Sequence, residues 1–156
     1  MPHGRTFVYV SIDNPFMQAA QGVANELSTD LNQPTGAVVV LDGKIVGKFA
    51  NQSALKNKRL LELHKNGWCV RRLLKVPTGQ KYWLCLGCAS FKHHGETGAT
   101  RDALLRNPEI DGAELYLYGH WWCCKPCWNE MEKAKIGKVY LLENSHILFN
   151  KNHLGN

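Results

Sequence analysis

His94-Gly95-Glu96 and Cys124-Lys125-Pro126-Cys127 are the two stretches around which the rest of this chain is arranged. The first places an imidazole two residues before a carboxylate, and the second places two thiols three residues apart. The segment between them has room for one helix and one strand. Either pair alone is common by chance, so the indication comes from their combination, each at the expected start of a helix.

These residue types suit one metal centre. Two thiolates and one imidazole are typical ligands of a tetrahedral Zn²⁺ ion that keeps its fourth position for water. Zinc lowers the pKa of that water towards ~7, so hydroxide is available at neutral pH. We therefore predict that His94, Cys124 and Cys127 bind zinc. Glu96 follows His94 by two residues, which suits it to carry protons between water and a substrate without being a ligand.

The motif has a known counterpart. His-x-Glu followed by Pro-Cys-x-x-Cys is the signature of zinc nucleobase deaminases, and this sequence resembles that cytidine deaminase-like superfamily. One position departs from it, because Cys123 stands where the pattern has proline. Cys123 is a conceivable competing ligand, paired with Cys127. The spacing of Cys124 and Cys127 favours these two, because both can reach one metal ion from the first turn of a helix.

Composition indicates one globular domain. Of 156 residues, 44% are hydrophobic and 21% are charged, which is ordinary for a single core. We predict one domain over residues 1–156, with its core at about 13–143. No signal peptide is apparent, and the longest apolar stretch, at 37–41, is too short to cross a bilayer. We therefore expect a cytoplasmic protein without a membrane partner.

The order of expected elements defines the fold class. In the first part of the chain, periodicity and turn residues predict a helix whose buried face runs from Phe16 to Leu31, followed by a hairpin of strands at 36–41 and 44–49. In the second part they predict a helix from His94 to before Asn107 and a strand at 114–118. A third helix begins at the second cysteine motif and is stopped by Gly137, and a strand follows at 137–143. Strands separated by helices pair in parallel, whereas the hairpin is antiparallel. The sequence therefore predicts an α/β fold, a three-layer αβα sandwich with a mixed sheet of about five strands. The resemblance implies the same architecture.

Residues 52–92 form a long insert before His94. In this the chain resembles deoxycytidylate deaminases more than the shorter tRNA adenosine deaminases, and some members of the former group bind a second, structural zinc here. Cys85 and Cys88 have the spacing of metal ligands. Buried, reduced thiols are the alternative. The residues that could complete such a site are Cys69, His64, His93 and Cys123.

The resemblance implies hydrolytic deamination of a cytosine-type base to a uracil-type base, first of all in a free deoxycytidine nucleotide such as dCMP. Glu96 would protonate the ring nitrogen and then the departing ammonia. In the superfamily an Asn just after the hairpin contacts the sugar of the substrate, and Asn51 stands at that place. A turn residue at a strand end is the alternative for Asn51. Superfamily members are usually oligomers, so we expect a homo-oligomer.

Other residues are candidates for substrate contacts. Trp121 and Trp122 could line a base pocket, or could equally belong to the core or to an oligomer contact. A nucleotide phosphate needs a cation, for which the insert offers Arg71, Arg72 and Lys75, although each could equally be a surface residue.

Two other functions stay open. The net charge of +6 suits phosphate-bearing partners or only solubility, so the substrate could be a base in tRNA or single-stranded nucleic acid. In a different class of protein, the two Cys-x-x-Cys pairs would form a structural, zinc-ribbon-like module without catalysis. That module would leave His-x-Glu at a helix start without a role.

Overall fold

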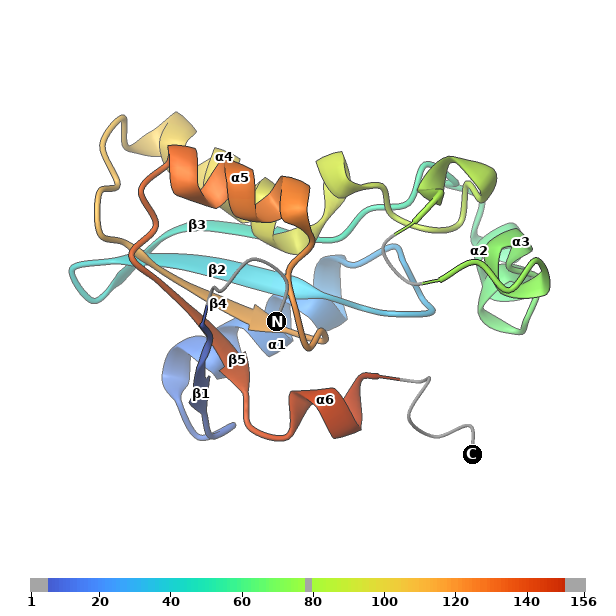
Figure 1. The fold of residues 1–156 in the computed structure, drawn as a ribbon, viewed down its shortest axis with the longest axis horizontal. Coiled ribbons are helices and arrows are strands. Elements are labelled where there is room, and N and C mark those ends of the chain that lie inside the picture. The colour runs from blue at the N-terminus through green and yellow to red at the C-terminus, as the bar shows by residue number, and fades with distance from the viewer. Residues whose placement is uncertain (1–5, 78–79, 151–156) are drawn as a thin grey trace.

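The computed structural model describes residues 6–77 and 80–150 (Figure 1). Its strands are β1 (Val8–Val10), β2 (Gly36–Leu41), β3 (Lys44–Ala50), β4 (Glu114–Tyr118) and β5 (Lys138–Leu142). Its α-helices are α1 (Pro15–Leu27), α2 (Lys58–Lys65), α3 (Val70–Leu73), α4 (Gly95–Arg106), α5 (Lys125–Lys133) and α6 (Ser145–Leu148). Two short 3-10 helices are η2 (Tyr82–Leu84) and η3 (Phe91–His93).

The five strands form one mixed sheet in the order β1-β5-β4-β2-β3. β5 pairs in parallel with both β1 and β4. β2 lies antiparallel to β3 in the hairpin and antiparallel to β4 on its other side. The predicted mixed sheet is confirmed, and β1 adds a short parallel edge strand.

The side chains of β2 point alternately to the two faces of the sheet and contribute to an apolar core on each face. Ala37 and Val39 belong to the larger cluster, which contains side chains of α4 and α5, whereas Val38 and Val40 belong to a second cluster with α1. Successive side chains of a strand point to opposite faces, so a strand buried on both sides must be apolar throughout, as β2 is. Figure 1 shows α1 on one side of the sheet and α4 with α5 on the other, which confirms the three-layer sandwich.

Helix α4 lies directly on β3. A Cβ atom added at Gly47 in β3 would stand 2.5 Å from the backbone nitrogen of Ala103 and the backbone oxygen of Ala99 in α4. A Cβ atom at Gly98 in α4 would collide with the ring of Phe49. These two glycines permit the close approach that fixes where α4 begins.

Helix α1 begins as expected and ends earlier. The side chain of Asn14 caps it by accepting hydrogen bonds from the backbone N–H groups of Phe16 and Met17 at 3.0 and 3.1 Å. The helix ends at Leu27, which is exposed, so the prediction that its buried face extends to Leu31 was wrong. After Leu27 the chain leaves the helix and leads to β2, and Leu31 lies in a turn of this connecting loop.

Helix α5 also ends earlier than predicted. It stops at Lys133, because the chain turns through a positive φ of 57° at Lys135 before reaching Gly137. Gly137 instead begins the approach to β5 through a backbone hydrogen bond to Ala113. No helix in the described residues is long and apolar enough to span a membrane. The cytoplasmic location, the homo-oligomer and the single domain over residues 1–156 stay predictions.

Candidate active site

The structure brings His94, Cys124 and Cys127 together. His94 is the N-cap residue of α4, Cys124 is the N-cap residue of α5, and Cys127 lies in the first turn of α5. The His94 Nδ1 atom is 3.7 Å from Cys124 Sγ and 3.5 Å from Cys127 Sγ, and the two sulfur atoms are 3.1 Å apart. Ligand atoms around a tetrahedral zinc ion are ~3.3–3.8 Å apart by the usual bond lengths. The two nitrogen–sulfur distances lie in this range and the two sulfur atoms are closer together, so the three donors surround one point where a metal ion could bind.

The charges of these groups also suit a metal. The hydrogen bond between the two sulfur atoms lowers the pKa of Cys124 most, and His94 lowers it further, so the pKa of Cys124 falls to about 5 despite its burial. Burial alone would lower the pKa of His94, but the hydrogen bond to Cys124 and the charge of Glu96 raise it. Cys124 is therefore a thiolate at neutral pH, which is the form that binds metals.

Two further groups orient these ligands. The Nε2 atom of His94 lies 3.3 Å from the backbone oxygen of Ala89, which leaves Nδ1 directed at the two cysteines. The hydroxyl of Thr97 donates to Cys127 Sγ at 3.1 Å. Such partners fix the orientation of ligands and tune their basicity. Sequence analysis missed both, and for Thr97 the only available signal was its place directly after Glu96.

Glu96 lies in the first turn of α4, is 4% exposed, and lines the same cavity as His94 and Cys124. The buried thiol of Cys123 faces this carboxylate. Burial, with the negative charges of Glu96 and Cys124, raises the pKa of Cys123 well above its usual value. Cys123 therefore keeps its proton beside Glu96, and in the described residues it lies outside the group of three that could hold a metal.

Asn51 follows β3 directly and lies in the wall of this cavity. Its Oδ1 atom accepts from the backbone N–H of Thr35 at 2.9 Å, and its Nδ2 group donates to the backbone oxygen of Gln33, also at 2.9 Å. Asn51 thus stabilises the 33–35 segment. Its contact with a substrate stays a prediction.

The cavity has a volume of about 190 Å³ and opens between the starts of the two helices and the insert. Trp121 and Trp122 both line it, and the ring of His120 stacks on Trp121 with centroids 4.4 Å apart and planes 2° apart. Burial and the nearby charge of His94 lower the pKa of His120 to about 4. A neutral imidazole and an indole therefore form one flat wall.

The insert supplies the opposite part of the wall. Tyr82 meets the ring of His94 edge-on, with centroids 5.1 Å apart, and Arg71 lies 4.2 Å from the centroid of the Tyr82 ring. Arg71 also donates to the backbone oxygens of Gln80 and Pro77 at 2.9 and 3.2 Å, so its guanidinium group holds the insert together. Nothing in the sequence indicated that Tyr82 belongs to the site, because the segment between Tyr82 and His94 is irregular and has no periodic pattern.

Arg72 is different from its neighbour. It is exposed and lines the cavity, and within residues 6–77 and 80–150 its side chain has no hydrogen bond or ion pair. Lys75 is also exposed, but it does not line this cavity. Of the three cations predicted as phosphate ligands, Arg72 alone combines a place at the cavity with an uncommitted guanidinium group.

Residues 10–143 match the family model described as the cytidine and deoxycytidylate deaminase zinc-binding region. The chain belongs to this family. It is therefore a zinc-dependent hydrolytic deaminase of the cytidine deaminase type, and the alternative of a zinc module without catalysis was wrong. The resemblance seen in the sequence is confirmed over nearly the same residues.

Solved structures of other deaminases are similar to this chain. The dCMP deaminase from cyanophage S-TIM5 has 18% identity and a TM-score of 0.49, with 87% of each chain covered. The guanine deaminase from Bacillus subtilis has 18% identity and a TM-score of 0.47, covering 90% of this chain and 72% of the other. A structure from a study of A-to-I editing by tRNA:A34 deaminases has 21% identity and a TM-score of 0.46, covering 81% and 75%. No curated protein matches the chain. At these values none of the structures assigns a substrate to this chain.

Proposed function

We propose that this enzyme deaminates a free deoxycytidine nucleotide, dCMP, to dUMP. The observation that carries the proposal is Arg72, an uncommitted cation at the edge of the cavity that contains Glu96 and the zinc ligands. A guanidinium group binds a phosphate through two parallel hydrogen bonds. A substrate with a 5′-phosphate can therefore place its base beside Glu96 while its phosphate meets Arg72.

In this proposal His94, Cys124 and Cys127 hold the zinc ion. When bound, zinc supplies a Lewis acid and an activated water at the cavity floor. Glu96 takes a proton from the water that adds to C4 of the base and passes it to the ring nitrogen N3. Glu96 next takes the proton of the new hydroxyl group at C4 and delivers it to the amine. The C4–N bond then breaks, and ammonia leaves as the carbonyl forms at C4. The buried thiol of Cys123 donates a hydrogen bond to Glu96 and holds the carboxylate in place.

The aromatic wall would orient the pyrimidine. The stacked pair of His120 and Trp121 presents a flat surface towards the cavity, and aromatic faces stack on bases at ~1–3 kcal/mol for each base. Asn51, on the wall near residues 33–35, would meet the sugar through the amide hydrogen that its structural bonds leave over. These contacts bind the base and the sugar, and they do not distinguish a free nucleotide from one within a strand.

A second candidate substrate is a cytosine within single-stranded nucleic acid. The observation that favours it is the exposure of Trp68 and Trp83 in the insert, at 71% and 77%, together with the net charge of +6. Exposed aromatic side chains and basic surface bind strands through stacking and phosphate contacts. The affinity for a strand falls steeply as the salt concentration rises, whereas the affinity for a nucleotide held by a single phosphate contact changes little.

The first test compares substrates directly. The zinc-loaded protein is incubated with dCMP, deoxycytidine, CMP and a short single strand containing cytosine, and ammonia release is measured in each. We expect turnover of dCMP and much weaker turnover of deoxycytidine, which has no phosphate. Turnover of the strand alone would support the second candidate, and no turnover of any of the four would refute a cytosine substrate.

A further inference from the structure

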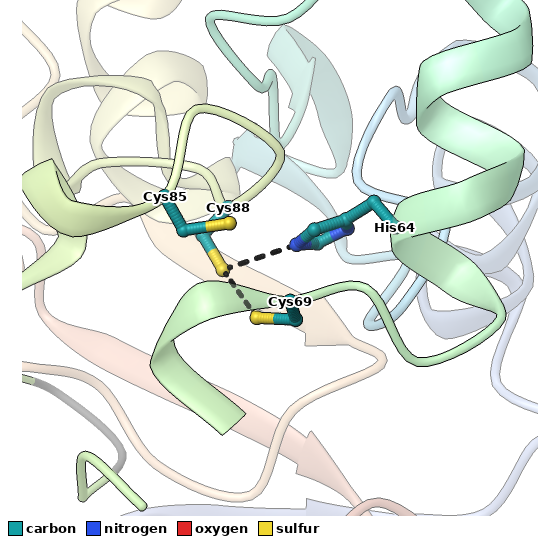
Figure 2. Close-up of side chains that lie close together, drawn as sticks. All are labelled: His64, Cys69, Cys85 and Cys88. Carbon is teal, nitrogen blue, oxygen red and sulfur yellow. Dashed lines mark hydrogen bonds between the residues drawn. The ribbon is translucent and has the colours of Figure 1, made fainter. Parts of the chain in front are cut away.

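A second cluster of metal-binding side chains lies in the insert. His64 comes from α2, Cys69 from the start of α3, and Cys85 and Cys88 from the loop after η2. One ligand atom of each lies within 4.8 Å of the others. Figure 2 shows the four side chains directed at one point, with Cys88 between His64 and Cys69.

The distances match four-coordinate zinc. The Cys88 sulfur is 3.6 Å from the Cys69 sulfur and 3.5 Å from His64 Nε2. Ligand atoms of a tetrahedral Cys₃His site are ~3.5–3.8 Å apart from the usual bond lengths. His64, Cys69 and Cys85 are at most 6% exposed. Four protein donors with this burial leave no open position, which is typical of a structural site.

The loop that carries two of the cysteines is shaped to close on His64. A Cβ atom added at Gly87 would collide with the His64 ring, so only glycine lets Cys85 and Cys88 approach from either side. The side-chain nitrogen of Asn32 lies 2.8 Å from His64 Nδ1. The Asn32 nitrogen is 3.4 Å from Nε2 of the same ring, and the sulfur of Cys88 is 3.5 Å from that Nε2 atom.

Apart from hydrogen bonds such as those of Arg71, the insert has little apolar packing to stabilise it. Neither of the two hydrophobic clusters includes any residue between 52 and 92. Several of its large apolar side chains are exposed, among them Trp68, Leu73, Leu74 and Leu86. A segment that cannot bury enough apolar surface depends on a disulfide or a metal, and all its cysteines are unpaired.

We propose that His64, Cys69, Cys85 and Cys88 bind a second, structural zinc ion that holds the insert against the active site. Cys69 and Cys88 themselves line the cavity, and two further contacts connect this cluster to it. Ala89, directly after Cys88, supplies the backbone oxygen beside His94 Nε2. Arg71 places Nη1 3.5 Å from Cys88 Sγ, and its neighbour Arg72 is the cation at the cavity. The structural ion therefore fixes the orientation of His94 and the position of Arg72.

Metal content tests the proposal without relying on activity. The protein is purified without chelator, and zinc per chain is measured by mass spectrometry for the wild type and for Cys85→Ser, His64→Asn and Cys123→Ser. We expect two zinc ions in the wild type and one in the first two variants. Cys123→Ser is the matched control, because it removes a buried thiol that belongs to neither cluster, and it should keep two.

The wild-type count decides the matter even where a variant fails to fold. One zinc ion per chain in the fully loaded wild type would overturn the proposal, and so would a disulfide among Cys69, Cys85 and Cys88 in that protein. Two ions in a folded Cys85→Ser variant would overturn the ligand assignment. Cobalt substitution gives a second readout, because loss of the Cys85 thiolate should reduce thiolate-to-cobalt charge-transfer absorption.

Discussion

At the scale of single residues, two acidic groups of this site, Glu96 and Cys124, have different neighbours and therefore different chemical properties. Glu96 is buried and faces the protonated thiol of Cys123, whereas Cys124 is held as a thiolate beside His94. Carboxylate and thiolate therefore stand near each other with different tasks. In the proposed mechanism the carboxylate moves protons, and the thiolate holds the metal.

Changing Glu96 to Gln should abolish turnover and spare the metal. The amide keeps the size of the carboxylate but carries no exchangeable charge, so we expect deamination to fall by ~10²-fold or more while zinc per chain stays the same. Ammonia release and zinc content are measured on one preparation. Glu130→Gln is the control and should keep full activity, because this half-buried carboxylate of α5 pairs with Arg101 outside the cavity. Loss of zinc from Glu96→Gln would mean that Glu96 is a ligand.

Changing Arg72 to Gln should weaken the binding of dCMP selectively. A hydrogen bond to a charged group contributes ~1.5–3 kcal/mol, so KM for dCMP should rise by ~10-fold or more. Activity on deoxycytidine, which lacks the phosphate, should not change. Lys75→Gln removes the same charge from an exposed position outside the cavity and should leave both values unaltered. Equal effects of the two variants would refute a phosphate contact by Arg72.

Stability should fall in acid partly because of His120. Its pKa is about 4 in the folded chain against a usual 6.5, so unfolding takes up a proton between these values. Stability is therefore fully present above pH 6.5 and decreases as the pH falls towards 4. At matched metal content, the urea midpoint of His120→Asn should decrease less over this range than that of the wild type. The exposed His146→Asn is the control and should follow the wild type.

At the scale of elements, the start of α4 is placed by its contact with β3. Gly47 permits that contact, since a Cβ atom there would stand 2.5 Å from backbone atoms of α4. His94 and Glu96 begin the same helix, so a shift of α4 moves a ligand and the proton carrier together. Small residues along one strand thus control the geometry of the catalytic groups.

Gly47→Ala should therefore lower stability by ~1–3 kcal/mol, the usual cost of overpacking a core. The matched control is Gly22→Ala in α1, where an added Cβ has no atom within 4 Å. Alanine is favoured over glycine inside a helix, so this variant should be stabilised by ~0.5–1 kcal/mol. Urea denaturation of both variants measures the difference. A Gly47→Ala variant as stable as the wild type would contradict the close packing.

At the scale of the whole molecule, the sheet and the insert are stabilised by different means. The sheet has an apolar core on each face, while the insert contributes to neither core and surrounds a cluster of thiols and one imidazole. The cavity lies where the two parts meet, lined by α4 from one and by Arg72 and Tyr82 from the other. Substrate binding thus depends on both parts.

Removal of metal should loosen the insert before the sheet. Metal binding contributes directly to the folding of small metal-stabilised segments, so a strong chelator should lower Tm and expose residues 52–92 to protease at a lower temperature than the rest. Mass spectrometry of the first cleavage products measures the order. Zinc added back should restore protection. First cleavage within the sheet would contradict this division.

The sequence by itself determined the mixed sheet and the sandwich, and it predicted His94, Cys124 and Cys127, which the fold brings together as a group that could hold a metal ion. These features rest on local signals: the continuous apolar run of β2, the helical spacing of apolar residues in α1, the turn residues between the hairpin strands, and two motifs that each begin a helix. Helix ends were less certain, as Leu27 and Lys133 show, because burial and a backbone turn decide them.

Only the tertiary structure decided how the irregular insert is arranged. Among four candidate partners for Cys85 and Cys88, folding selects His64 and Cys69. It also engages Arg71 in backbone hydrogen bonds and leaves Arg72 at the cavity. Adjacent residues with the same side chain differ here through contacts with distant parts of the chain, which no local pattern encodes. The physical reason is that ligand sets and cavities are defined by distances in space, whereas periodicity reports only on neighbours along the sequence.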